Sequence, residues 1–257
     1  MLLAFDIGNT TTHFALYDGA ERIAHFRVLS ERDRTGDEWD IIVTMLLARR
    51  KIEWEQIRCA AICSVVPQIE RSVSEMLQQR MGERPLLINA GLTLGMEIRY
   101  DQAALGADRF ANAVGAYLRY LHRDTVVVDL GTATKLEAVL SGGVYLGGVI
   151  LPGIGISCDA LYARAAKLSQ VELTAPPSVI GTNTADALRA GILHGYAAQV
   201  EGLVARFRAQ MKRPDAHVTL TGGYAEMIAS FSPLFTDVQP FWTLDSIRLI
   251  HKRYRGH

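Results

Sequence analysis

Two short segments carry the residue types that could hold a phosphate chain. Asp6-Ile-Gly-Asn-Thr-Thr11 follows an apolar run, and Asp129-Leu-Gly-Thr-Ala-Thr134 repeats the pattern 123 residues later. Glycine has no Cβ, so a phosphate can approach the backbone closely at such a turn, and the threonines of both segments can add hydroxyl donors. The aspartates cannot bind an anionic phosphate directly. They suit a cation that bridges phosphate oxygens.

A single Asp-x-Gly-x-Thr segment is most simply an ordinary hairpin turn. Here the match continues at the same offset in three further pairs: Ala15 with Ala138, Leu16 with Val139, and Gly19 with Gly142. We therefore predict an internal duplication. Two such hairpins can grip one polyphosphate from either side, which favours an ATP-dependent phosphotransferase.

Gly106-Ala-Asp-Arg109 stands at the start of an amphipathic stretch over residues 106–121. Asp108 has two open interpretations: an N-cap worth about 1 kcal/mol, or a general base placed at the positive end of a helix. Arg109 is either a solvated surface charge or a group that holds a carboxylate or hydroxyl of an acceptor.

Two more glycine segments are weaker signals. Gly222-Gly223 follows the predicted strand 217–221 and precedes a short predicted helix, so its backbone could approach a base or ribose. Gly181-Thr-Asn-Thr184 most simply caps the long helix predicted over residues 185–211.

The remaining pattern predicts strands alternating with helices. Strands are predicted at 2–7, 13–17, 22–28, 58–66 and 144–151, and helices at 37–50, 67–81 and 243–255. In the helix at 37–50, helical spacing places four apolar side chains on one side: Trp39, Ile42, Met45 and Leu46.

Composition excludes several classes of protein. The 257 residues suffice for two lobes, and Lys plus Arg equals Asp plus Glu at 27 each, so the basic footprint of a nucleic-acid binder is missing. Cys59, Cys63 and Cys158 are too few for a disulfide framework, and we expect the first two to pack in a buried strand. No leader or 18-residue apolar run is found, so we expect a cytoplasmic protein with no nucleic-acid or membrane partner.

With these motifs the chain closely resembles the type III pantothenate kinases, which belong to the superfamily of acetate and sugar kinases, heat-shock chaperone ATPases and actin. The combination of Gly106-Ala-Asp-Arg109 with Asp129-Leu-Gly-Thr-Ala-Thr134 some twenty residues later is specific to this family, and the resemblance covers nearly the whole length. It also rests on four other segments: Asp6-Ile-Gly-Asn-Thr10, Gly147-Gly148 with Pro152-Gly153, Gly181-Thr-Asn-Thr184, and Thr221-Gly-Gly223.

The resemblance implies an α/β chain with a duplicated actin-like (ribonuclease H-like) fold, in which each of two lobes has a mixed β-sheet flanked by helices. We expect residues 1–116 to form the first lobe and residues 117–257 the second, with the helix at 243–255 packing back on the first. The implied activity is ATP-dependent phosphorylation of the primary hydroxyl of pantothenate to 4'-phosphopantothenate, the first step of coenzyme A biosynthesis. The implied cofactors are ATP with Mg²⁺ and a monovalent cation, K⁺ or NH₄⁺. The implied assembly is a homodimer with the pantothenate site near the interface.

The resemblance also implies roles for individual residues. Asp108 would be the base that takes the proton from pantothenate, and Asp129 would coordinate the monovalent cation. The implied ATP-binding residues are Asp6, Ile7, Gly8, Asn9, Thr10, Thr11, Thr12, His13, Thr132, Gly222 and Gly223. The implied pantothenate-binding residues are Tyr100, Gly106, Ala107, Arg109 and Thr184.

The second hairpin departs from the family pattern, which usually reads Asp-x-Gly-Thr-Ala-Thr-Thr-x-Asp. Lys135 and Glu137 stand where this pattern has its last Thr and its final Asp. One hypothesis is that Lys135 places an ammonium near the phosphates or the cation and so reduces the need for potassium. Because neighbouring residues on a strand alternate faces, Lys135 could equally point away.

Two other functions share parts of this pattern. An actin-like regulatory protein could bind nucleotide without phosphorylating a metabolite, but such a protein needs no base at Asp108. A sugar kinase of the same superfamily is the second rival. Some sugar kinases carry a structural zinc site of clustered Cys and His, and this sequence lacks such a cluster.

Overall fold

The computed structural model describes residues 1–121, 123–165 and 168–256. It contains two compact units, which are described separately. Unit 1 comprises Met1–Met96, Tyr100–Arg119 and Trp242–His257, and unit 2 comprises Glu97–Arg99 and Tyr120–Phe241. None of the described helices combines the length and apolar character that crossing a membrane requires.

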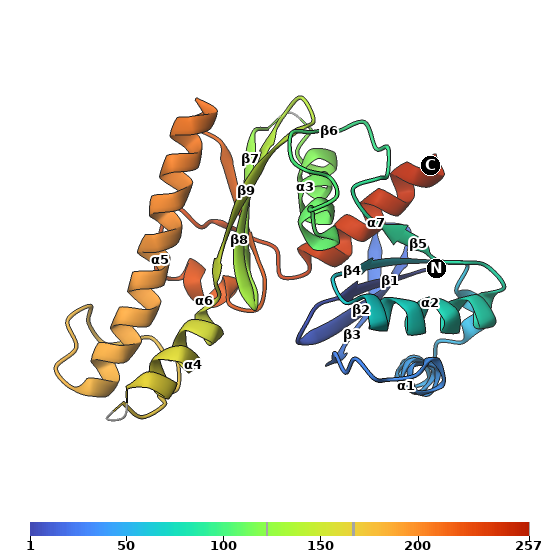
Figure 1. Ribbon diagram of the computed structural model, residues 1–257, viewed down its shortest axis with the longest axis horizontal. Helices are drawn as coiled ribbons and strands as arrows, with labels where there is room; N and C mark the ends of the chain where they lie inside the picture. Colours follow the sequence, from blue (N-terminus) through green and yellow to red (C-terminus); the bar gives the residue numbers. More distant parts are fainter. Residues whose placement is uncertain (122, 166–167, 257) are drawn as a thin grey trace. The chain divides into compact units, whose positions relative to one another are not determined.

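Unit 1 is built on a five-stranded mixed sheet in the order β3-β2-β1-β4-β5 (Figure 1). Its strands are β1 (Leu2–Ile7), β2 (Thr11–Asp18), β3 (Glu21–Leu29), β4 (Cys59–Ser64) and β5 (Leu86–Ile88). Its helices are α1 (Gly36–Ala48), α2 (Pro67–Met81), α3 (Ala107–Arg119) and α7 (Trp242–Arg255), with a 3₁₀ turn at Trp54–Gln56. Strand β1 is antiparallel to β2 and parallel to β4.

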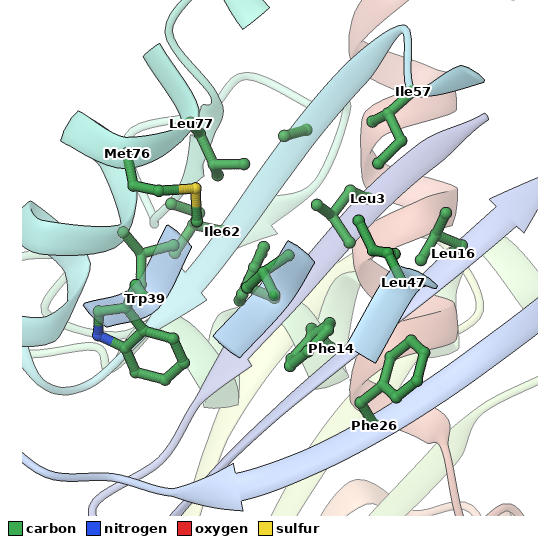
Figure 2. Close-up of a cluster of buried hydrophobic side chains, with 14 of the residues drawn as sticks. Leu3, Phe14, Leu16, Phe26, Trp39, Leu47, Ile57, Ile62, Met76 and Leu77 are labelled. Atoms are coloured by element: carbon green, nitrogen blue, oxygen red, sulfur yellow. The ribbon is translucent and has the colours of Figure 1, made fainter. Parts of the chain in front are cut away.

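Helices α1 and α2 cover one face of this sheet and close a hydrophobic core. Figure 2 shows Leu3 and Phe14 from the strands packed near Trp39 and Leu47 of α1 and Met76 of α2. Helix α1 begins with a capping box between Thr35 and Glu38. Burial of such apolar faces supplies most of the stability of short helices.

The buried face of α1 differs from the prediction. The residues that enter the core are Trp39, Val43 and Leu47, each one turn from the next, whereas Met45 is 64% exposed. Met45 therefore does not share the side of Trp39, and its predicted placement there was wrong. Apolar side chains occur on several sides of this helix, so periodicity alone could not select the face that packs.

The opposite face of the unit 1 sheet packs on α3 and α7. Tyr17 of β2 donates a hydrogen bond to Asp245 of α7 over 2.7 Å. The Trp242 indole donates to the backbone carbonyl of Asn112 in α3 over 3.2 Å. The two helices cross where Gly115 meets Ser246, so closely that a Cβ on Gly115 would lie 2.6 Å from Ser246 Cβ.

Replacing Gly115 with Ala should therefore destabilise unit 1. The added methyl group forces α3 and α7 apart, and we expect the free energy of unfolding to fall by about 2–3 kcal/mol. Urea unfolding followed by circular dichroism measures this change. Gly142→Ala is the control, because a Cβ there meets no atom within 4 Å. Equal unfolding midpoints for the two variants would contradict the close contact between Gly115 of α3 and Ser246 of α7.

Unit 2 repeats this architecture with the sheet order β11-β10-β7-β8-β9-β6. Its strands are β6 (Glu97–Ile98), β7 (Thr125–Leu130), β8 (Ala133–Leu140), β9 (Val144–Pro152), β10 (His217–Thr221) and β11 (Asp237–Val238). Its helices are α4 (Ile154–Arg164), α5 (Thr184–Met211) and α6 (Ala225–Ala229). Apart from β6, the order β9-β8-β7-β10-β11 matches β3-β2-β1-β4-β5 strand for strand.

Strand pairing corrects the register of the repeat. Asp6 pairs with His13 in unit 1, and Asp129 pairs with Lys135 in unit 2. Three residues separate β1 from β2, but only two separate β7 from β8. The sequence offset between β2 and β8 is therefore one residue smaller than the offset between β1 and β7. The bulge between Leu16 and Tyr17 accordingly recurs between Ala138 and Val139. Leu16 thus corresponds to Ala138, so the predicted matches of Ala15 with Ala138 and of Leu16 with Val139 were both wrong.

Candidate functional site

The first predicted phosphate loop is the turn between β1 and β2. The Gly8 amide donates to the Thr11 carbonyl over 3.1 Å, and the Ser30 amide donates to the Thr10 carbonyl over 3.0 Å. Asn9 and Thr10 are exposed at the tip. A Cβ on Gly8 would lie 3.0 Å from the Thr11 carbonyl oxygen, so glycine lets this turn close tightly.

Two side chains of this loop point into the core. Ile7 and Thr12 are fully buried, and Thr12 Oγ1 lies 2.8 Å from Ser30 Oγ. Both side chains support the turn from the core side of the sheet. Only their backbone groups can face a ligand.

His13 lies beside the loop on the other face of β2. Its Nδ1 atom is 3.0 Å from His25 Nε2, and its Nε2 atom is 3.3 Å from Thr11 Oγ1. Burial, with smaller contributions from the nearby His25 and Arg27, lowers the pKa of His13 from 6.5 to about 4. The ring is neutral at pH 7, so it can offer a hydrogen bond to a phosphate but no positive charge.

In unit 2, the second hairpin and the Gly222-Gly223 turn lie at the same edge of the sheet. Strands β7 and β10 are parallel, with Thr221 beside Asp129, so both turns follow carboxyl ends of strands. Ligands of open α/β sheets bind at such ends. Gly222 has φ +93°, and the Tyr224 amide donates to the Leu130 carbonyl over 3.2 Å. The structure thus brings Thr132 and Gly222-Gly223 to one place.

Gly153 is a third part of this edge that sequence reasoning did not include in the ATP site. Its amide donates to the Thr132 carbonyl over 3.2 Å, and a Cβ would lie 2.3 Å from that oxygen. Gly153 is the N-cap of α4. The N-terminus of α4, with its partial positive charge, therefore lies at the second hairpin turn. The signal for it in the sequence was the Pro152-Gly153 pair.

Thr134 does not offer its hydroxyl to solvent. Its side chain is fully buried, and Tyr196 Oη lies 2.7 Å from Thr134 Oγ1 and 2.5 Å from the Pro152 carbonyl oxygen. Thr134 holds the same place on β8 that Thr12 holds on β2, and both hydroxyls have partners in the protein.

Lys135 points toward Asp129. Its Nζ atom lies 2.9 Å from Asp129 Oδ2, and the two side chains are 15% and 14% exposed. The alternative in which Lys135 points away is therefore wrong.

Within the described ranges, three or more His, Cys, Asp or Glu side chains do not gather into a metal-binding cluster.

Asp108 lies in the first turn of α3, which begins at Ala107. Its Oδ1 atom accepts a hydrogen bond from the Arg109 amide over 2.8 Å. A Cβ on Gly106 would lie 2.9 Å from the same oxygen. A carboxylate in the first turn is stabilised by the positive end of the helix.

Arg109 is not a solvated surface charge, because it is only 5% exposed. Its guanidinium carbon lies 5.0 Å from the centre of the Tyr100 ring, and Nη1 donates to Tyr100 Oη over 3.2 Å. The structure thus joins two of the predicted pantothenate-binding residues. A planar guanidinium next to an aromatic ring is well suited to hold a carboxylate.

Thr184 is the first residue of α5 and is exposed. The preceding residue, Asn183, caps the helix by accepting a hydrogen bond from the Asp186 amide over 2.9 Å. The interpretation of residues 181–184 as a helix cap is confirmed. A role for Thr184 in binding pantothenate stays a prediction.

The chain is similar to known proteins over nearly its whole length. The family model described as type III pantothenate kinase matches residues 2–206. A type III pantothenate kinase of Moorella thermoacetica is 41% identical over 254 residues, which are 98% of this chain and 99% of the relative. A type III pantothenate kinase of Myxococcus xanthus is 42% identical, with 98% of each chain covered.

Solved structures share the fold. Component A of (R)-2-hydroxyglutaryl-CoA dehydratase from Acidaminococcus fermentans aligns with a TM-score of 0.55 and 16% identity, over 99% of this chain and 98% of that chain. At this identity the likeness concerns the fold alone. Together with the two mixed sheets of matching strand order, it confirms the predicted duplicated actin-like fold.

Proposed function

The chain belongs to the type III pantothenate kinase family, and we therefore propose that it transfers the γ-phosphoryl group of ATP to the primary hydroxyl of pantothenate. Such a reaction makes it a transferase of coenzyme A biosynthesis. The rival in which an actin-like protein binds nucleotide without acting on a metabolite is not favoured, because the relatives are kinases over nearly the full length.

We propose Asp108 as the general base of this reaction. A primary alcohol is a poor nucleophile until a base removes its proton as it attacks, and a positioned base contributes roughly 10²–10⁴-fold. The first turn of α3 holds the carboxylate, and the Arg109 amide binds one of its oxygens. This fixed orientation is the observation that carries the proposal.

We propose that Arg109 and Tyr100 hold the acceptor. Pantothenate has one carboxylate, and the Arg109 guanidinium is a buried cation one residue from the base. An ion pair with the substrate carboxylate would fix the hydroxyl end relative to Asp108, because positioning supplies much of the catalysis of phosphoryl transfer. Gly106, Ala107 and Thr184 stay further predicted contacts.

We propose that the two hairpin turns hold ATP, which enters as its magnesium complex. Backbone amides at the exposed tip Asn9-Thr10 and at Gly131-Thr132 would donate to phosphate oxygens, supported by the N-terminus of α4. Gly223, where a Cβ meets no atom within 4 Å, leaves open backbone for the adenosine part. Magnesium neutralises phosphate charge during transfer.

We propose that the protein is a homodimer and lies in the cytoplasm. A groove of about 380 Å³ in unit 2 lies between β9 and α5. Ile150, which lines this groove, is 61% exposed. A second copy of the chain covering this apolar surface would give the expected homodimer. A cytoplasmic location agrees with a metabolic kinase.

The deciding experiment measures ADP release with and without pantothenate. We expect release to depend on pantothenate and the product to be a phosphomonoester at its primary hydroxyl, detected by mass spectrometry. Glucose and N-acetylglucosamine serve as control acceptors and should give only background release. Absence of pantothenate-dependent ADP release would rule out the kinase function, and release with a control acceptor would favour the sugar kinase rival.

A further inference from the structure

The monovalent cation implied by the resemblance does not fit Asp129. Potassium would have to bind the Asp129 carboxylate, but Lys135 Nζ already lies 2.9 Å from Asp129 Oδ2. Two cations at one carboxylate repel each other, and the repulsion grows in a partly buried site where the effective dielectric is low. Asp129 is therefore a poor potassium ligand in this chain.

The backbone holds the pair in place. Asp129 and Lys135 are directly opposite each other in the antiparallel β7–β8 ladder. Directly opposed side chains have their Cβ atoms within about 5.5 Å of each other. With the side chains only 14% and 15% exposed, water screens the pair little. Lys135 is thus positioned by the hairpin and not by a chance surface contact.

The chemistry of the lysine side chain matches the ion that it would replace. The head of lysine is an ammonium with three donors and a compact single charge, and ammonium is one of the two cations that the resemblance implies. Glu137, two residues further along β8, is fully buried and accepts a hydrogen bond from Tyr145 over 2.5 Å. The face of the hairpin that holds Asp129 therefore carries two acidic side chains, Asp129 and Glu137, together with the ammonium group of Lys135.

We propose that the Lys135 ammonium serves as a built-in monovalent cation at Asp129, so that the enzyme works without potassium. The proposal rests on the kinase function proposed above. In unit 1 the corresponding place opposite Asp6 belongs to His13, which is neutral at pH 7, so a fixed charge opposite the aspartate is a property of the second hairpin.

The wild-type enzyme provides the first test. Pantothenate-dependent ADP release is measured with magnesium and tetramethylammonium as the cations, and again with KCl at equal ionic strength of about 0.1 M. We expect the two values of kcat/KM to agree within about twofold, since no ion is needed at Asp129. A loss of about tenfold or more without potassium would overturn the proposal.

Lys135→Ala provides the second test, because it removes the ammonium and leaves space for an ion. We expect the rate without potassium to fall at least about tenfold, since Asp129 loses its partner, and KCl or NH₄Cl to restore it. Lys252→Ala, which removes an exposed lysine of α7, should behave as wild type. Full activity of Lys135→Ala without potassium would contradict the proposal.

A binding measurement separates this proposal from the kinase function. The thermal unfolding midpoint is compared in KCl and tetramethylammonium chloride with a non-hydrolysable ATP analogue present. Wild type should show no potassium-specific rise, and Lys135→Ala should show one. A potassium-specific rise in wild type overturns the proposal even if pantothenate is not the acceptor. If Lys135→Ala does not fold, the wild-type comparison decides alone.

Discussion

Asp108→Asn is expected to lower kcat with pantothenate by about a thousandfold, because it removes the general base and keeps the size of the side chain. The asparagine Oδ1 can still accept the hydrogen bond from the Arg109 amide, so the first turn of α3 should stay intact. The KM for ATP should change little, since the base acts on the acceptor hydroxyl. Initial rates of ADP release at several concentrations of each substrate measure these constants.

Asp101→Asn is the matched control for this prediction. Asp101 is an exposed acid seven residues before the base and accepts a hydrogen bond from the Ala103 amide over 3.0 Å. Its replacement removes one negative charge from the same segment and should leave kcat within about twofold. Full activity of Asp108→Asn would eliminate Asp108 as the base. Equal losses in both variants would indicate a general effect of charge on the segment.

Elements with strong local signals could be predicted to the residue. The buried strands Leu2–Ile7 and His217–Thr221 are short apolar runs between turn residues. Helix α2 begins at Pro67 and ends at Met81, and its C-cap Gly82 adopts φ +72°. Proline at the first turn and a left-handed glycine at the end are the two strongest marks of helix boundaries.

Elements that depend on distant partners could not be predicted. Strand β6 has two residues, Glu97–Ile98, and exists because it pairs with Val144 and Tyr145 of β9. Two residues carry no periodicity. The register of the repeat could not be predicted either. The turn of the second hairpin is one residue shorter than that of the first, which changes which residues of β2 and β8 correspond but leaves the motif unchanged.

Residue types in the site could be predicted, but side-chain directions could not. The sequence left open whether Lys135 faces Asp129, and only the β7–β8 pairing settles that they are opposite. Likewise, Thr12 is in the loop motif yet faces the core. A motif indicates which backbone forms a turn, whereas strand alternation and tertiary packing decide which side chains line it.

Gly222→Ala is expected to have the largest effect on stability. At φ +93° an L-residue is strained, and an added Cβ would lie 2.5–2.7 Å from the carbonyl carbon, carbonyl oxygen and amide nitrogen of Leu130. Backbone atoms cannot move aside as a flexible side chain would. We expect the free energy of unfolding to fall by about 3–4 kcal/mol, from backbone strain and overlap together.

The adjacent Gly223→Ala separates this effect from the mere loss of a glycine. A Cβ on Gly223 meets no atom within 4 Å, so its free energy of unfolding should stay within about 0.5 kcal/mol of wild type. Urea unfolding gives both values, and titration with an ATP analogue gives the affinity. Because Gly222 packs on Leu130, next to the Gly131-Thr132 turn, its replacement should also weaken nucleotide binding at least about tenfold. Equal urea midpoints for the two variants would mean that Gly222 does not pack against Leu130 of the second hairpin. That outcome would remove the contact that supports the proposed ATP site.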